Sequence, residues 1–303
     1  MIKRFVYLLG AVASLLLLAP AHGAVAADAV PHRGTLYRVR YHGSTTYLFG
    51  TIHVGTADFF PLAPDVMRAF NRASRLVVEL DPRDAQPFQQ ALQRHGFYPD
   101  GDSLDKHLPA PALARVKQAL QQYDIPYEKA ARMKPWMIAN LLDSINLQHH
   151  GYQSGEGTEM HLLALADSEK KPIEQLESAD FQMGLFDDMP ASEQQQYLLE
   201  SLAELDDGEA LKEDVALINA WASADGKAIQ GVLVDSGKAK PAASRFIQQV
   251  LLDKRNPRMA DKIAALVNQG GSSFVAIGLL HLVGKNGVPA LLKQRGYQVE
   301  KVY

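Results

Sequence analysis

Two short segments at opposite ends of the chain share one pattern, an apolar run followed by a glycine and then a histidine three residues later. The first segment carries Gly50 and His53, and the second carries Gly278 and His281. Apolar runs bounded by glycine are typical of buried strands, and a glycine at a strand end permits close approach of a backbone or a ligand. We predict that the fold brings both strand ends together, so that the two imidazoles share one polar site.

Each histidine segment belongs to a predicted strand-helix-strand unit. The first unit is a hairpin over 35–49, a helix over 61–73 and a strand over 76–78, and the second is a strand over 273–277, a helix over 288–295 and a strand over 297–303. The predicted fold class is therefore α/β (α+β), with two similar crossover units that form an approximate internal repeat.

A long helical insertion, residues 84–235, separates the two units. Its apolar residues recur at three- and four-residue spacing over 110–123, 135–149, 158–167, 192–205 and 209–222. Ser192 is predicted to open a capping box, and a short strand is predicted over 171–177. After the insertion we expect an exposed linker at 238–241, a helix over 242–252 and a further helix that Asn256 begins as its cap.

Residues 1–26 have the pattern of a cleavable signal peptide. A cationic start precedes an apolar run over 5–21, and Ala24-Val25-Ala26 supplies the small-x-small cleavage pattern. We expect cleavage near Ala26/Ala27 and a single domain over 27–303, periplasmic or secreted, with no stable membrane insertion after cleavage. The alternative is an uncleaved anchor, since the run approaches the roughly 18 residues that span a bilayer.

Composition excludes several classes of function. The chain has no cysteine, so disulfides, thiolate metal ligands and a cysteine nucleophile are excluded. Its net charge is −3 and no basic run is interleaved with aromatic residues, so we expect no nucleic-acid partner. The sequence does not specify an oligomeric state.

A carboxylate is the third candidate for the histidine site. Glu79 directly follows the strand at 76–78, and if that strand runs parallel beside the first histidine strand, Glu79 emerges at the same edge as His53. The alternative is a solvated charge at a strand end. Two imidazoles and one carboxylate form a three-ligand set for a divalent metal with a position open to water, and Zn²⁺ is compatible with it. Glu79 is either a ligand or the base that deprotonates water.

Five motifs together resemble those of the TraB/GumN family, which is related to the Tiki proteases and more distantly to erythromycin esterase and ChaN-like proteins. The motifs are Phe49-Gly50-Thr51-Ile52-His53-Val54-Gly55, Val77-Val78-Glu79, Leu176-Glu177, Arg255-Asn256 and Ala276-Ile277-Gly278-Leu279-Leu280-His281-Leu282-Val283-Gly284. The resemblance runs over essentially the whole chain after residue 26.

The resemblance implies an α/β fold of two related halves around a mixed central sheet, with a helical insertion between them. It also implies a metal-dependent hydrolase that acts on a peptide or protein substrate and uses Mn²⁺ or Co²⁺, and the predicted signal peptide would make this hydrolase an exported one. By similarity, His53, Glu79 and His281 occupy the essential positions. Arg255 would orient Glu79 or a substrate carboxylate, although a role for it and Asn256 at the start of a helix explains the motif equally well.

Two further acidic residues are candidates at the same site. Glu177 ends the short strand predicted at 171–177. Glu159 lies in the first turn of a predicted helix, where the helix dipole alone favours a carboxylate.

Two other functions remain open at the sequence level. The first is an exported protein that binds haem, a metal ion or a small ligand without turnover, which a Soret band or retained iron would reveal. The second is a metal-independent, esterase-like hydrolase in which a histidine is the general base, and its activity would be insensitive to chelators.

Overall fold

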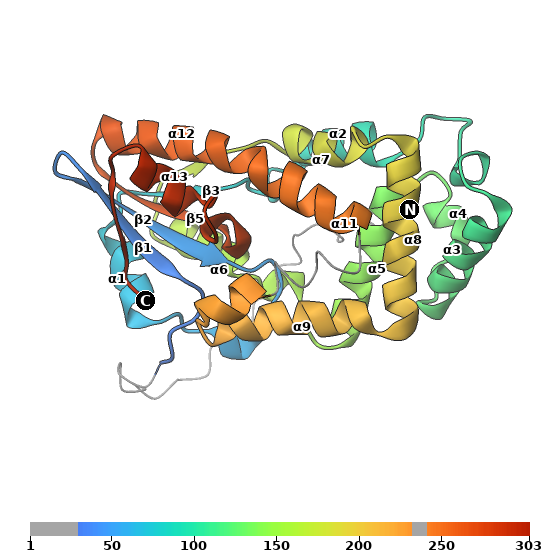
Figure 1. Cartoon of the computed structure of the whole chain (residues 1–303), viewed down its shortest axis with the longest axis horizontal. Coiled ribbons are helices and arrows are strands. Elements are labelled where there is room, and N and C mark those ends of the chain that lie inside the picture. The colour runs from blue at the N-terminus through green and yellow to red at the C-terminus, as the bar shows by residue number, and fades with distance from the viewer. Residues whose placement is uncertain (1–29, 232–240) are drawn as a thin grey trace.

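The computed structural model describes residues 30–231 and 241–303, which form a mixed sheet and a layer of helices on each of its faces (Figure 1). The six strands of this part of the chain lie in the order β4-β3-β5-β2-β1-β6. Their bounds are β1 Leu36–Tyr41, β2 Ser44–Thr51, β3 Arg75–Val78, β4 Ile173–Gln175, β5 Ser272–Gly278 and β6 Gln298–Lys301. The predicted mixed α/β sheet is confirmed. The predicted signal peptide and most of the linker at 238–241 lie outside the described residues.

The strand order corrects one prediction. Strand β5 lies between β2 and β3 and pairs in parallel with both, so β2 and β3 are not neighbours. Phe274, Val275 and Ala276 of β5 are fully buried, as expected for a central parallel strand that is covered on both faces. The second histidine strand is therefore the centre of the sheet, and His53 and Glu79 follow the strands on either side of it.

Both faces of the sheet are covered by helices. Helices α1 (Pro64–Arg72) and α6 (Thr158–Ser168) pack on one face, where Leu76 and Phe274 contribute to the core. Helices α12 (Arg255–Gln269) and α13 (Val288–Gln294) pack on the other face, against the alternate strand residues. Successive side chains of a strand point to opposite faces, so each buried strand contributes to both cores.

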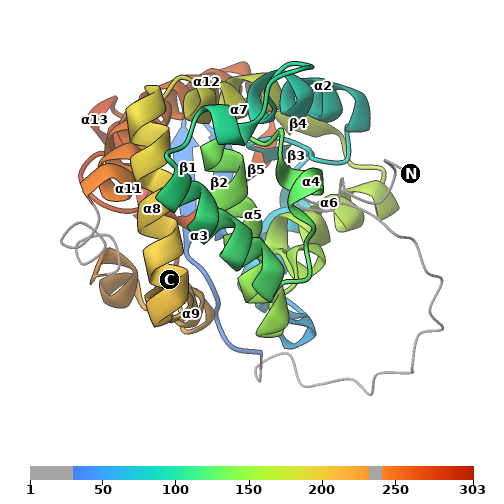
Figure 2. The same ribbon diagram turned by 90° about the vertical axis from the view of Figure 1, so that its right-hand side faces the viewer.

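The insertion forms a helical layer beside the sheet, with its own apolar core around the buried Trp136 (Figure 2). Its helices include α2 Ala85–Gly96, α3 Ala110–Gln122, α4 Tyr127–Ala130, α5 Pro135–His149, α6 Thr158–Ser168, α7 Ala179–Asp187, α8 Ala191–Asp207 and α9 Glu209–Ala222. Among them, α6 and α9 contribute buried residues to the core against the sheet. The five predicted helices are confirmed, and so is the predicted strand, which is β4 and joins the sheet. After the insertion, α11 (Pro241–Arg245) continues into the π-helix η6 (Phe246–Asp253) where an α-helix was predicted.

Two predicted helix caps are wrong. Helix α8 starts at Ala191 after Pro190, so Ser192 lies inside its first turn, and no side chain caps that helix. Helix α12 starts at Arg255 and continues directly from the π-helix, so Asn256 is its second residue. The side chain of Asn256 is instead engaged with His281.

Within the described ranges, no helix combines the length and the apolar character that crossing a bilayer requires.

A carboxyl pair between α5 and α9 gives a pH-dependence prediction. Burial and the neighbouring Asp143 raise the pKa of Asp214 to about 8. The folded protein therefore holds a proton that the unfolded chain releases near pH 4, so the free energy of unfolding falls as the pH rises from about 4 to 8. The slope from this one group is at most about 1.4 kcal/mol per pH unit. We expect Asp214→Asn to remove that contribution, so that its stability advantage over the parent grows with pH. Urea unfolding at pH 5, 6.5 and 8 checks this, and parallel curves for the two proteins would contradict it.

Candidate active site

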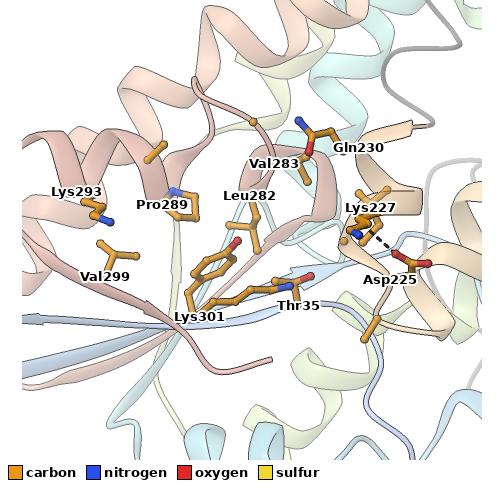
Figure 3. Close-up of a pocket in the computed structure, with 16 residues that line it drawn as sticks. Thr35, Asp225, Lys227, Gln230, Leu282, Val283, Pro289, Lys293, Val299 and Lys301 are labelled. Carbon is orange, nitrogen blue, oxygen red and sulfur yellow. Dashed lines mark hydrogen bonds between the residues drawn. The ribbon is translucent and has the colours of Figure 1, made fainter.

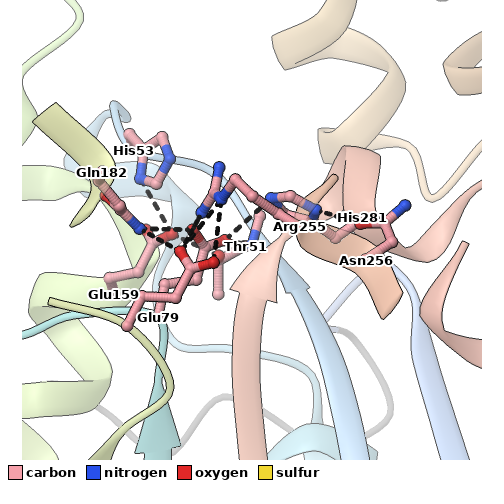
Figure 4. A network of polar contacts seen from close by, with 10 residues as sticks. Thr51, His53, Glu79, Glu159, Gln182, Arg255, Asn256 and His281 are labelled. Carbon is pink, nitrogen blue, oxygen red and sulfur yellow. Dashed lines mark hydrogen bonds and ion pairs between the residues drawn. The ribbon is translucent and has the colours of Figure 1, made fainter. Parts of the chain in front are cut away.

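The carboxyl ends of the parallel strands bring the sequence-predicted residues together (Figure 4). His53 lies two residues after β2, Glu79 directly follows β3, and Glu177 lies two residues after β4. His281 is part of the 3-10 turn η7 (Leu279–Leu282) that follows β5. The first turns of α6 and α12 contribute Glu159 and Arg255. This edge of the sheet is where open α/β proteins bind ligands.

Arg255 links two carboxylates at the centre of the site. Its Nη2 donates to Oε2 of Glu79, and its Nε and Nη2 donate to Oε2 of Glu177 over 3.0 and 2.7 Å. All three residues are buried, with 9% or less of their surface exposed. A buried charge requires a partner of opposite charge, so the guanidinium and the two carboxylates hold each other in place.

Glu79 is held as an anion. Its Oε1 accepts the backbone N–H of Gly278 over 2.6 Å and lies 3.6 Å from Nε2 of His281. Burial opposes its ionisation, but His281, Arg255, His53 and the Gly278 N–H together keep the pKa of Glu79 at about 2. The site therefore contains a fixed negative charge at neutral pH.

His281 is held as a neutral imidazole with a defined tautomer. Asn256 donates its Nδ2 to the carbonyl of Asn286 over 2.9 Å, which turns its Oδ1 toward Nδ1 of His281 at 2.6 Å. Nδ1 therefore carries the proton, and the lone pair of Nε2 faces Glu79. Burial lowers the pKa of His281 to about 4. An imidazole in this state can act as a base or as a metal ligand.

His53 is also oriented through Nδ1, but its pKa is shifted in the opposite direction from that of His281. Its Nδ1 lies 3.0 Å from Oε1 of Glu159, which also accepts the Thr51 hydroxyl. The charge of Glu159 raises the pKa of His53 to about 9, so the ring is a cation at neutral pH. The other oxygen of Glu159, Oε2, is buried and has no hydrogen-bond partner among the described residues.

The space above Gly278 is where the three predicted residues converge. A methyl carbon on Gly278 would lie 3.1 Å from Oε1 of Glu79, 3.6 Å from Cδ2 of His281 and 3.9 Å from Nε2 of His53. We call this space the Gly278 cradle. Both histidines use Nδ1 to contact an oxygen outside it, so the Nε2 atoms of both rings are left for a ligand in the cradle.

Gly50 of the first motif has a different role, and this gives a second prediction. A methyl carbon there would lie 2.7 Å from Cδ1 of Leu279 and 3.1 Å from Cδ1 of Leu282. Gly50 therefore makes room for η7 rather than for a ligand. We expect Gly50→Ala to lower the free energy of unfolding by about 1–3 kcal/mol through overpacking. Chemical denaturation measures this, with Gly155→Ala as the control because nothing lies within 4 Å of that position. Equal stability of the two variants would contradict the prediction.

Three polar side chains support the site without having been predicted from the sequence. Gln182 of α7 donates to Oε2 of Glu79 and to Oε2 of Glu177 over 3.2 and 2.8 Å. Thr51 donates to Glu159, and the Thr158 hydroxyl accepts the backbone N–H of Ile52 over 2.9 Å. In the sequence, only their positions near predicted site residues point to a role. Thr51 lies two residues before His53, and Thr158 directly precedes Glu159. Gln182 has no such signal, since it reaches the site through the packing of α7.

The side chains fit a metal in chemistry but not in spacing. Two imidazoles and a carboxylate are suitable donors, and all three face the Gly278 cradle. However, no group of three histidine, aspartate or glutamate residues within 30–231 and 241–303 is spaced to hold a metal ion. Both oxygens of Glu79 are already engaged, one by Arg255 and the other by the Gly278 N–H.

The fold and this site define a class of protein, an α/β protein with paired glycine-histidine strand ends around a buried glutamate. The family model for the TraB/PrgY/gumN family matches residues 35–301, and the chain belongs to that family.

Several curated proteins are similar to the chain. "Uncharacterized protein YbaP" of Escherichia coli is 25% identical over 82% of this chain and 87% of its own length. "Metalloprotease TIKI2" of Xenopus tropicalis is 25% identical over 88% of this chain, which spans 59% of the TIKI2 sequence. "Metalloprotease TIKI2" of Danio rerio is 42% identical over 57 residues, or 18% of this chain and 11% of its own. No solved structure matches the chain.

Proposed function

We propose that this protein is an exported, metal-dependent hydrolase that cleaves amide bonds in peptides, with its active site in the Gly278 cradle. The observation that carries the proposal is the arrangement of the two histidines. Each ring is anchored through Nδ1, to Glu159 or to Asn256, and presents Nε2 to the cradle. Metal-ligating histidines typically have one nitrogen fixed by an acceptor in this way. The choice of peptides as substrate follows from the similarity to the two TIKI2 proteins, which are named metalloproteases.

In this proposal His53, His281 and Glu79 would hold a divalent metal, Mn²⁺, Co²⁺ or Zn²⁺, and His53 would give up its Nε2 proton on binding it. The metal would supply water activation and polarisation of the carbonyl group.

The chain's own residues supply the remaining chemistry. Glu79 is ionised and fixed by Arg255, so it would present a negative charge to a cation in the cradle. Glu177 binds Arg255, and Gln182 binds both Glu79 and Glu177. These contacts fix the orientation of the Glu79 carboxylate. His53 sits at the open side of the site, with a side chain that is 75% exposed, where it can meet a substrate entering from solvent.

One observation favours a second candidate, a metal-independent hydrolase that uses the same residues. The pKa of His281 lies near 4 and that of His53 near 9, so one imidazole is neutral and the other is charged at pH 7. Pairs of titratable groups whose pKa values are pushed apart are suited to roles as base and acid. His281 would then accept the proton from water, and His53 would donate a proton to the leaving group.

Metal content tests the proposal directly. We expect the purified protein, reloaded with Mn²⁺, Co²⁺ or Zn²⁺ and then desalted, to retain about one ion per chain. His53→Ala and His281→Ala should both lose it, whereas His150→Ala, an exposed histidine at the end of α5, should not. Equal metal content in all four proteins would show that the metal site is wrong.

Hydrolysis of a mixed fluorogenic peptide library then separates the two candidates. Activity that a chelator abolishes and added metal restores supports the metal-dependent hydrolase. Activity that a chelator leaves unchanged, and that His281→Ala removes, supports the metal-independent one. A protein that retains metal but cleaves no peptide would contradict both.

A further inference from the structure

A second pocket lies at the same end of the sheet as the active site, beyond β1 (Figure 3). Its volume is about 750 Å³, within the range of roughly 300–1,000 Å³ typical of small-molecule sites. Its walls come from the start of β1, from β6, from η7 with the residues after it, from α13, and from a short helix over 226–231. None of the residues assigned above to the active site lines this pocket.

The charge of the pocket is strongly positive for a chain with a net charge of −3. Lys227, Lys293 and Lys301 line it, and among its described lining residues Asp225 is the one carboxylate. Oδ1 of Asp225 accepts the backbone N–H groups of Lys227 and Ala228 over 2.9 and 3.1 Å. Across the part of the chain that the structure describes, none of the three lysines forms an ion pair with a carboxylate.

The lysines come from separate elements and surround a shared concave surface. Lys227 lies on the 226–231 helix, Lys293 on α13 and Lys301 at the end of β6. The Lys301 side chain reaches across the pocket, since its Nζ would lie 3.3 Å from a methyl carbon placed on Gly226. Like charges gathered around a concave surface focus a positive potential into it, which attracts an anion.

The floor of the pocket is apolar. Leu282 and Val283 of the η7 region, Pro289 of α13 and Val299 of β6 line it (Figure 3). An inorganic anion would gain nothing from such a floor, whereas a hydrocarbon or aromatic body would be removed from water against it. An apolar floor with a few charged groups around it is the usual composition of a site for an organic ligand.

We infer that this pocket is a binding site for an amphipathic organic anion, a carboxylate that carries a hydrocarbon body. The lysines would bind the carboxylate, and the floor would bind the hydrocarbon chain. The inference does not depend on the proposed hydrolase activity, because it uses other residues and is tested by binding alone. The pocket is nevertheless next to the active site, because its lining residue Leu282 directly follows His281 and packs against Gly50.

Calorimetric titration of the purified protein with dodecanoate below its micellar concentration tests the inference. We expect one molecule per chain and weaker binding at higher ionic strength. Replacing all three pocket lysines by glutamine (K227Q, K293Q, K301Q) should weaken binding about tenfold, since each exposed ion pair contributes a factor of roughly two to three. All three lysines are exposed, so we expect the variant to retain the parent's unfolding temperature.

A matched triple variant serves as the control. Lys117, Lys170 and Lys212 are exposed lysines outside the pocket, and their replacement by glutamine makes the same change in net charge. We expect this variant to bind dodecanoate as the parent does. The inference is overturned if both triple variants bind equally well, or if dodecyltrimethylammonium, a cation with the same chain length, binds the parent as tightly as dodecanoate.

Discussion

Arg255→Met is expected to lower the free energy of unfolding by about 3–5 kcal/mol, the range measured when one partner of a buried ion pair is removed. Methionine fills much of the same volume, so the loss comes from Glu79 and Glu177, which would remain buried without their shared cation. Urea denaturation at pH 7 measures the effect. The difference from the parent should shrink as the pH falls toward 4, because protonation then neutralises the unpaired carboxylates in the variant.

Arg258→Met is the matched control for this experiment. Arg258 lies on the same helix, but it is exposed and its guanidinium lies 5.2 Å from the centre of the Phe181 ring. An exposed cation–π contact contributes about 0.5–1 kcal/mol, so this variant should change stability by no more than that. If both variants lose the same small amount, the two carboxylates do not depend on Arg255.

The local elements of this fold were predictable because each carries its own signal. The β1–β2 hairpin has alternating residues around a glycine turn, and α5 and α9 have regular apolar spacing bounded by recognisable ends. The order of the strands had no such signal. The chain visits β2 and β3 in succession, yet β5, added last among the three, is inserted between them. Strand order depends on which faces bury best in three dimensions, and periodicity along the chain does not encode it.

The candidate site was likewise predictable only in part. His53, Glu79 and His281 were predictable because each follows a buried strand, and parallel strands end at one edge of the sheet. The contacts of Asn256 show the limit. Its position at the start of a helix suggested a cap, but the helix begins one residue earlier, at Arg255, and the amide of Asn256 contacts Asn286 and His281 instead. Gln182 comes from the insertion, whose placement over the site depends on packing.

The two glycines of the repeated motif look equivalent in the sequence and are not equivalent in space. A side chain at Gly50 would meet Leu279 and Leu282, whereas one at Gly278 would enter the space shared by Glu79, His281 and His53. The missing side chain of Gly50 therefore makes room for the packing of η7, whereas that of Gly278 leaves open the space between the site residues. This difference makes Gly278 the position at which the cradle can be filled without removing any of its functional groups.

Gly278→Ala is expected to reduce peptide hydrolysis by roughly tenfold, because Oε1 of Glu79 must give way by a few tenths of an ångström and a displacement of about 1 Å costs about 100-fold. The backbone of Gly278 has φ −49° and ψ 136°, a conformation that alanine adopts without strain. The added methyl carbon would lie 3.1 Å from Oε1 of Glu79, so that carboxylate must shift within the cradle. Initial rates on the peptide library and metal content after reloading are the two measurements, and metal retention should fall with the rate.

Gly155→Ala is the matched control, because it adds the same methyl group where no atom of the described residues beyond its chain neighbours lies within 4 Å. We expect its rate to equal that of the parent, and we expect the unfolding free energy of both variants to stay within about 1 kcal/mol of the parent. A Gly278→Ala protein that is folded and fully active would show that the cradle is not where the reaction occurs. An inactive but folded Gly278→Ala beside an active Gly155→Ala would place the chemistry among Glu79, His281 and His53, since the three heavy atoms nearest to the added carbon belong to these residues.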